Sequence, residues 1–203
     1  MKTEKNELSI VLIGLLIALL TLTVSCEDYN DDEYIGPSTS DNDNSVTEIR
    51  DVEGFHSISA AIVGNILLTQ GPIQEVELEA QPDFLYGVET TVINGVLEMK
   101  FDESITKNGK VGDFTARITI PDIRSLTLSG VGGLIAQNDL HTEDLIINRT
   151  GVSNVSLRGE AQHLEIISTG VGNVNAFDMT SKSCTILSEG FGGVEVTVTE
   201  WQA

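Results

Sequence analysis

From residue 47 onward, short apolar runs alternate with glycine, asparagine and aspartate, and no long stretch has the 3.6-residue period of a helix. Runs rich in Val, Ile, Leu and Thr between such turn residues are typical of β-strands. In the first half of this region, the pattern predicts strands at residues 57–69, 74–80, 87–93, 96–101, 115–120 and 126–129. The chain is therefore expected to fold as an all-β protein.

Two local signals set boundaries between these strands. Asn94-Gly95 separates two of the runs, and this dipeptide favours the tight turn of a β-hairpin. Pro121 follows the run at 115–120, and proline cannot donate a hydrogen bond to a neighbouring strand. We therefore expect a hairpin at residues 94–95 and a strand that ends before Pro121.

The second half contains a repeat of about twenty residues. Gly130, Gly151, Gly170 and Gly190 are spaced by 21, 19 and 20 positions. Four further columns align with these glycines, at positions −4, +1, +3 and +4. Their members are Leu126, Ile147, Ile166 and Ile186; Val131, Val152, Val171 and Phe191; Gly133, Asn154, Asn173 and Gly193; Leu134, Val155, Val174 and Val194.

Short strands repeated at this period predict a β-helix-like solenoid, with the β-rich N-terminal half continuing or capping the stack. Each copy would form one coil and pair with the next at a distance of about 4.8 Å. The apolar columns are then expected to fill the interior. The four glycines are expected at corners that need a positive φ, and stacked asparagines there can form hydrogen bonds along the axis.

The N-terminus has the pattern of a targeting segment. Lys2 and Lys5 precede an apolar run at 10–20, which is shorter than the roughly 20 residues that span a bilayer. Residues 1–25 are therefore predicted to be a signal peptide. "LTVSC" at 22–26 resembles a lipoprotein cleavage site, which would make Cys26 the lipid anchor of an exported protein held to a membrane, most plausibly the outer membrane and its surface. The alternative is an ordinary signal-peptidase site.

The segment that follows is predicted to be a tether. Residues 26–46 contain five acidic residues within 27–33 and a Gly-Pro-Ser-Thr-Ser break, and residues 27–45 contain no basic residue. Such a sequence has too little apolar surface to order itself. The domain organisation is then a signal peptide at 1–25, a flexible acidic tether at 26–46 and a solenoid domain at 47–203.

Charge and cysteine content narrow the functional classes. The formal net charge of −20 argues against nucleic acid as a partner, because polyphosphate has the same sign. If Cys26 is lipidated, Cys184 has no disulfide partner. Cys184 stands in an alternating stretch and is interpreted as a small core residue.

No catalytic, metal-binding or cofactor motif was found. His56, His141 and His163 match no metal-ligand spacing. Asp139, Glu143 and Asp144 form a loose acidic group, but no acidic column recurs at equal repeat positions, as a pair of catalytic carboxylates on adjacent coils would require. The sequence therefore predicts a protein that is not an enzyme and has no cofactor.

Residues 55–71, 88–100 and 118–134 resemble the head-GIN domain family, and the resemblance extends over about 47–200. That family is described as auto-transporter adhesins and is common in exported Bacteroidetes proteins. It implies a right-handed, single-stranded β-helix and brings no catalytic residues. The second copy departs from the pattern, because Arg149 and Ser153 stand where small residues or glycine would fit more smoothly.

The expected function is that of a non-enzymatic envelope lipoprotein, and most plausibly a surface module that binds a glycan or a protein. Two alternatives stay open: binding or processing of carbohydrate in the periplasm, and a structural role in the envelope. An acidic column that faces a groove would favour processing. A flat polar face would favour adhesion.

Overall fold

The computed structural model describes residues 45–102 and 113–199 of the chain. The predicted signal peptide, Cys26 and nearly all of the predicted tether lie outside these residues. The described part is one 13-stranded sheet with a four-residue helix, α2 (Pro82–Leu85). None of its helices is both long and apolar enough to cross a membrane. The predicted all-β class is confirmed.

The first half of the sheet contains seven strands, and most of them were expected. They are β1 (Val46–Arg50), β2 (Ser57–Ala61), β3 (Val63–Gln70), β4 (Glu75–Ala80), β5 (Val88–Ile93), β6 (Val96–Phe101) and β7 (Thr115–Ile120). The run predicted as one strand at 57–69 is broken at Ile62 into β2 and β3. The hairpin is confirmed, because β5 and β6 pair antiparallel around Asn94 (φ 51°) and Gly95 (φ 79°).

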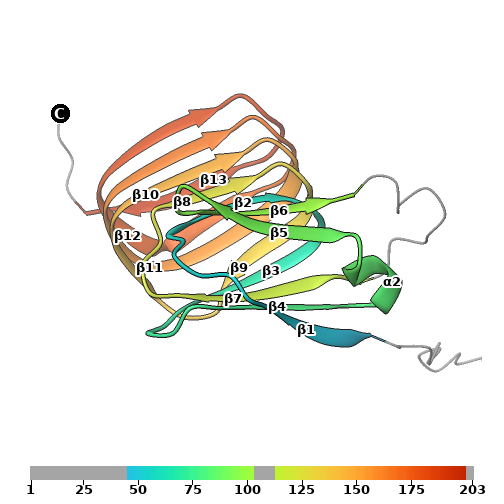
Figure 1. Ribbon diagram of the computed structural model, residues 1–203. Helices are drawn as coiled ribbons and strands as arrows, with labels where there is room; N and C mark the ends of the chain where they lie inside the picture. The colour runs from blue at the N-terminus through green and yellow to red at the C-terminus, as the bar shows by residue number, and fades with distance from the viewer. Residues whose placement is uncertain (1–44, 103–112, 200–203) are drawn as a thin grey trace, which may run out of the picture. The chain divides into compact units, whose positions relative to one another are not determined.

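The second half contains the repeat. Its strands are β8 (Ser125–Leu128), β9 (Val131–Ala136), β10 (Leu140–Arg149), β11 (Val152–Ser168), β12 (Val174–Ser188) and β13 (Val194–Val198). Of these, β10, β11 and β12 are longer than the strands of the first half. The copies pair in parallel, so that Ile147 lies opposite Leu126 and Ile166, and Ile166 lies opposite Ile186. The predicted stacking of the repeat is therefore confirmed, and Figure 1 shows these strands layered in yellow to red.

The N-terminal strands do not simply continue this parallel stack. β2 and β3 do pair in parallel with β8 and β9, but β1–β4 and β4–β7 are antiparallel. The sheet curls until it is nearly closed, like a barrel (Figure 1). Its interior contains one continuous apolar core that reaches from Phe55 to Met179.

The interior columns behave as predicted except at the last copy. Leu126, Ile147 and Ile166 are fully buried, as are Leu134 and Val174. The residues at the same positions of the last copy, Ile186 and Val194, are more exposed. No described strand pairs with the free edge of β12 beyond Ser181. The core therefore thins out toward the C-terminal end of the stack.

Glycine occupies the corners because adjacent copies approach too closely for a side chain. A Cβ on Gly170 would lie 2.0 Å from the carbonyl oxygen of Gly151, and a Cβ on Gly190 would lie 2.0 Å from that of Gly170. The predicted reason, a positive φ, was wrong for these corners. Positive φ occurs two residues later, for example at Gly172 (124°). The sequence shows where glycine recurs but not which constraint selects it.

The irregular second copy is accommodated by a buried arginine. Arg149 is 1% exposed, and its Nη1 donates a hydrogen bond to the Ser153 carbonyl oxygen at 3.3 Å, while its Nη2 donates to Ser168 Oγ. Burial lowers the pKa of Arg149. The guanidinium therefore ties one corner to the next copy at a cost in desolvation.

Candidate binding face

The strands β3, β9, β11, β12 and β13 stack in parallel and present one side to solvent, here called the outer face (Figure 1). Because side chains alternate across a strand, every second residue of each copy lies on this side. Three columns of side chains run across the strands: Val63, Val131, Val152, Val171 and Phe191; Asn65, Gly133, Asn154, Asn173 and Gly193; Leu67, Ile135, Ser156, Asn175 and Glu195.

The first column contradicts the prediction that all apolar columns fill the interior. Val131, Val152 and Val171 are 50%, 52% and 46% exposed, and Phe191 is 81% exposed. The residues at position +4, such as Leu134, are buried, so the alternation of the strand leaves position +1 on the solvent side. Whether an apolar column is exposed is therefore set by its spacing from the buried position: an odd number of residues places it on the opposite side of the strand.

The second column is a ladder of asparagine side chains. Asn154 Oδ1 accepts a hydrogen bond from the backbone N–H of Asn173 at 2.9 Å, and Asn173 Oδ1 accepts one from the N–H of Gly193 at 2.8 Å. In the third column, Asn175 Oδ1 accepts from the N–H of Phe177 at 3.2 Å. These bonds run from backbone to side chain, and they fix which end of each amide is the oxygen.

A groove of about 360 Å³ lies over the last three copies on this face. It is lined by Asn154, Val155, Ser156, Asn173, Val174, Asn175, Gly193 and Glu195. Glu195 is the only carboxylate among these lining residues. Most glycoside hydrolases use a pair of carboxylates, and the lining of this groove contains one.

Two exposed aromatic residues flank the groove along the strand direction. Phe191 stands two residues before Gly193 on the outer face, and Phe177 stands two residues after Asn175 on the exposed side of β12. Their exposed fractions are 81% and 64%. Rings exposed in this way can cover the apolar surface of a bound molecule.

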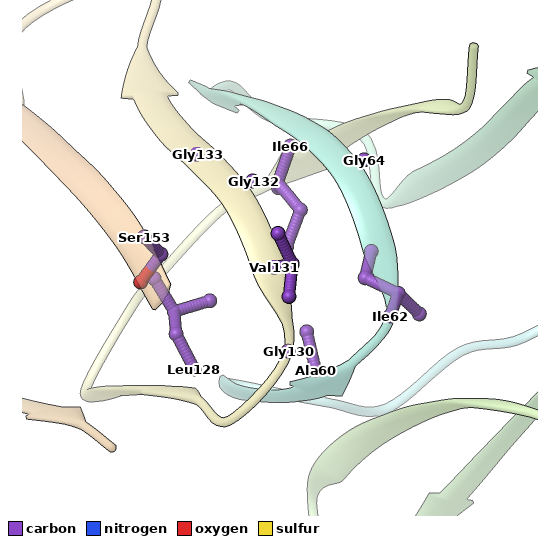
Figure 2. A pocket seen from close by; sticks show the side chains of 10 residues that line it. All are labelled: Ala60, Ile62, Gly64, Ile66, Leu128, Gly130, Val131, Gly132, Gly133 and Ser153. Atoms are coloured by element: carbon purple, nitrogen blue, oxygen red, sulfur yellow. The ribbon is translucent and has the colours of Figure 1, made fainter. Parts of the chain in front are cut away.

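Figure 2 shows a second hollow, at the corner of Gly130, where β9 pairs with β3. It measures about 10 Å³, which is room for about one water molecule, and Ile62, Leu128, Gly130 and Ser153 are among its lining residues. Ser153 Oγ is buried without a hydrogen-bond partner in the described part of the chain. This hollow is too small for an organic ligand.

The histidines do not converge on a site. His56 Nδ1 lies 3.1 Å from Ser57 Oγ, His141 Nδ1 lies 3.0 Å from Glu160 Oε1, and His163 Nδ1 lies 2.7 Å from Ser183 Oγ. Across residues 45–102 and 113–199, no three His, Cys, Asp or Glu side chains are grouped as a metal ion would require.

The acidic group and the described cysteine form no reactive site. Asp139 lies 3.4 Å from the Arg158 Nε, in an exposed ion pair. Cys184 is partly buried and is a free thiol, and burial raises its pKa, which lowers its reactivity. The groove was missed because no motif marks it, although the repeat aligns Asn154 with Asn173 and Gly193, and Ser156 with Asn175 and Glu195.

These features define an all-β repeat protein whose parallel strands present a grooved face with an exposed apolar column beside a ladder of asparagines. Residues 54–201 match the family described as "Putative auto-transporter adhesin, head GIN domain", and the chain belongs to this family. The resemblance drawn from the sequence is thereby confirmed. A comparison with curated proteins finds no match.

Solved structures share the fold. A "putative adhesin" from Bacteroides fragilis is similar with a TM-score of 0.57 and 21% sequence identity, over 74% of this chain and 96% of that chain. A "putative adhesin" from Parabacteroides distasonis is similar with a TM-score of 0.51 and 17% identity, over 74% of this chain and 81% of that chain. At these identities, the likeness establishes the fold alone.

Proposed function

We propose that the chain is a non-enzymatic adhesion module of the cell envelope, which binds its target through the groove on the outer face. The observation that carries the proposal is the geometry of that groove. Asn154, Asn173 and Asn175 have oriented amides, and Phe177 and Phe191 flank them. A rigid sheet that holds such groups in rows distributes contacts over an extended target.

The family description and the names of the related proteins support an adhesive role. In this proposal, Cys26 carries a lipid that holds the protein to the outer membrane, and residues 26–46 are the acidic tether. The parallel copies are the coils of a right-handed β-helix, which forms the head. The absence of a second carboxylate among the groove residues favours binding over carbohydrate processing.

Cells that produce the full-length chain test this proposal. They should adhere to surfaces coated with glycans or matrix proteins, whereas cells that produce the Phe177→Ala/Phe191→Ala variant at the same level should not. Equal adhesion of both cell types would refute a role for the groove.

A second experiment tests the anchor. The Cys26→Ala variant should leave the membrane fraction, and protease treatment of intact cells should remove the wild-type protein. Membrane partition of the Cys26→Ala variant would refute lipid anchoring.

A further inference from the structure

The groove presents hydrogen-bond donors in fixed positions. Asn154, Asn173 and Asn175 each use the side-chain oxygen to accept a backbone N–H. Each NH₂ group is left as a double donor with no partner in the described residues. Because the oxygens are held by the strands themselves, these donors need no reorientation when a ligand binds.

One strong acceptor stands beside these donors. Glu195 lies opposite Asn175 in the β12–β13 ladder and lines the same groove. A ligand in this groove must therefore accept hydrogen bonds from amides and donate one to a carboxylate. Neighbouring hydroxyl groups do both, since a hydroxyl is a donor and an acceptor at once.

Charge disfavours an acidic ligand. The Glu195 carboxylate is part of the groove wall, and the whole chain has a formal charge of −20. A carboxylate or sulfate group on the ligand would compete for the same amide donors, but it would lie against Glu195 and in the field of an acidic protein. A hydroxyl-rich ligand without charge avoids this cost.

The aromatic rings of Phe177 and Phe191 favour a ligand that also has an apolar surface. Phe177 and Phe191 are 64% and 81% exposed, so each can cover an apolar surface of a bound molecule. A pyranose ring has a face of C–H groups and a rim of hydroxyls, which matches an aromatic ring beside a row of amides. A peptide backbone also donates and accepts hydrogen bonds, so the two aromatic rings, and not the polar groups, favour a sugar over a peptide.

Building on the proposed function, we infer that the groove binds a neutral, hydroxyl-rich glycan. The sugar hydroxyls bond to the amides of Asn154, Asn173 and Asn175 and to the Glu195 carboxylate, and the sugar rings stack on Phe177 and Phe191.

The test measures binding of the purified full-length chain to neutral hexose and N-acetylhexosamine oligosaccharides, with oligogalacturonate of matched length as the acidic comparison. The neutral probes should bind and oligogalacturonate should not. Asn175→Ala and Phe177→Ala should each weaken binding by about tenfold or more, in line with the loss of one good contact. Gln162→Ala and Leu187→Ala, exposed positions of β11 and β12 outside the three columns, should bind as wild type.

Glu195→Gln is the variant that tests the charge argument. The amide keeps a polar side chain of the same size, so the neutral probes should still bind, and oligogalacturonate should now bind as well. Tighter binding of oligogalacturonate than of neutral probes to the wild type would overturn the inference. So would neutral binding that the groove variants leave unchanged.

The adhesion assay separates this inference from the proposed function. If no glycan probe binds but cells still adhere to matrix proteins through the groove, the glycan inference fails and adhesion stands. If the cells adhere to nothing, both fail.

Discussion

Ile166 and Ile186 lie directly opposite each other in the β11–β12 ladder, yet Ile166 is 0% exposed and Ile186 is 43% exposed. The following copy covers Ile166, whereas no described strand pairs with the free edge of β12 at Ile186. One column of the repeat therefore contributes very unequally to stability along its length.

The same truncation at these two positions should give different losses of stability. Ile166→Ala should lower the free energy of unfolding by about 2–5 kcal/mol, because it leaves a cavity in packed surroundings. Ile186→Ala should lower it by less than about 1 kcal/mol, since much of that side chain already contacts water. Urea unfolding of both variants measures this, and equal losses would show that the last copy is covered in solution.

The corner glycines should tolerate no side chain. Gly170→Ala places a Cβ 2.0 Å from the Gly151 carbonyl oxygen, so the copies must separate, at a cost of about 1–3 kcal/mol or more. Gly193→Ala is the matched control, because its Cβ would meet nothing closer than 3.7 Å. Thermal unfolding compares the two variants, and a stable Gly170→Ala protein would contradict the close approach of the copies.

Ser168, which accepts a hydrogen bond from the buried Arg149, should contribute more to stability than Ser188, its neighbour in the next copy. Ser168→Ala removes the Oγ that accepts from Arg149, and it leaves a charged donor unsatisfied in the core. We expect a loss of about 1–3 kcal/mol in denaturant unfolding. Ser188 lies opposite Ser168 but is exposed, so Ser188→Ala should be neutral. A neutral Ser168→Ala would argue against this bond.

Cys184 should react slowly as a thiol. In the Cys26→Ala variant it is the chain's only cysteine, so alkylation reports on it alone. Burial raises its pKa, and the alkylation rate should therefore rise at a higher pH than for free cysteine, whose pKa is about 8.5. A rate profile that coincides with free cysteine would contradict the burial effect.

The raised pKa of Cys184 also links stability to pH. The thiol contributes stability that is present below the unfolded-state pKa and is lost as pH rises through the folded-state pKa. Alkaline conditions should therefore destabilise the Cys26→Ala protein more than Cys26→Ala/Cys184→Ser, as measured by urea unfolding at several pH values. The same alkaline loss in both proteins would assign it to other groups.

The features that could be predicted from the sequence depend on neighbouring residues or on the repeat. The Asn94-Gly95 hairpin needs only its own dipeptide, and the parallel stacking follows from the spacing of Gly130, Gly151, Gly170 and Gly190. The antiparallel pairing of β1, β4 and β7 was not predictable, since it joins segments with no common pattern.

The candidate site was less predictable than the fold for a similar reason. Whether Val152 faces the core or the solvent depends on its register relative to Val155, which is buried. The groove depends on Asn175 and Glu195 standing opposite each other across two strands. The repeat aligns these positions, but it does not say which of them are buried or that the exposed ones line a groove.

The parallel register of the copies has a consequence for how such a protein changes over generations. Duplication of one segment, from one corner glycine to the next, adds a complete row to the outer face and leaves the other rows in place. A copy inserted between β11 and β12 would lengthen the groove by one strand, and that strand would have its own residue at the position of Asn154. The length of the grooved face can thus be inherited as a number of copies, separately from its chemistry.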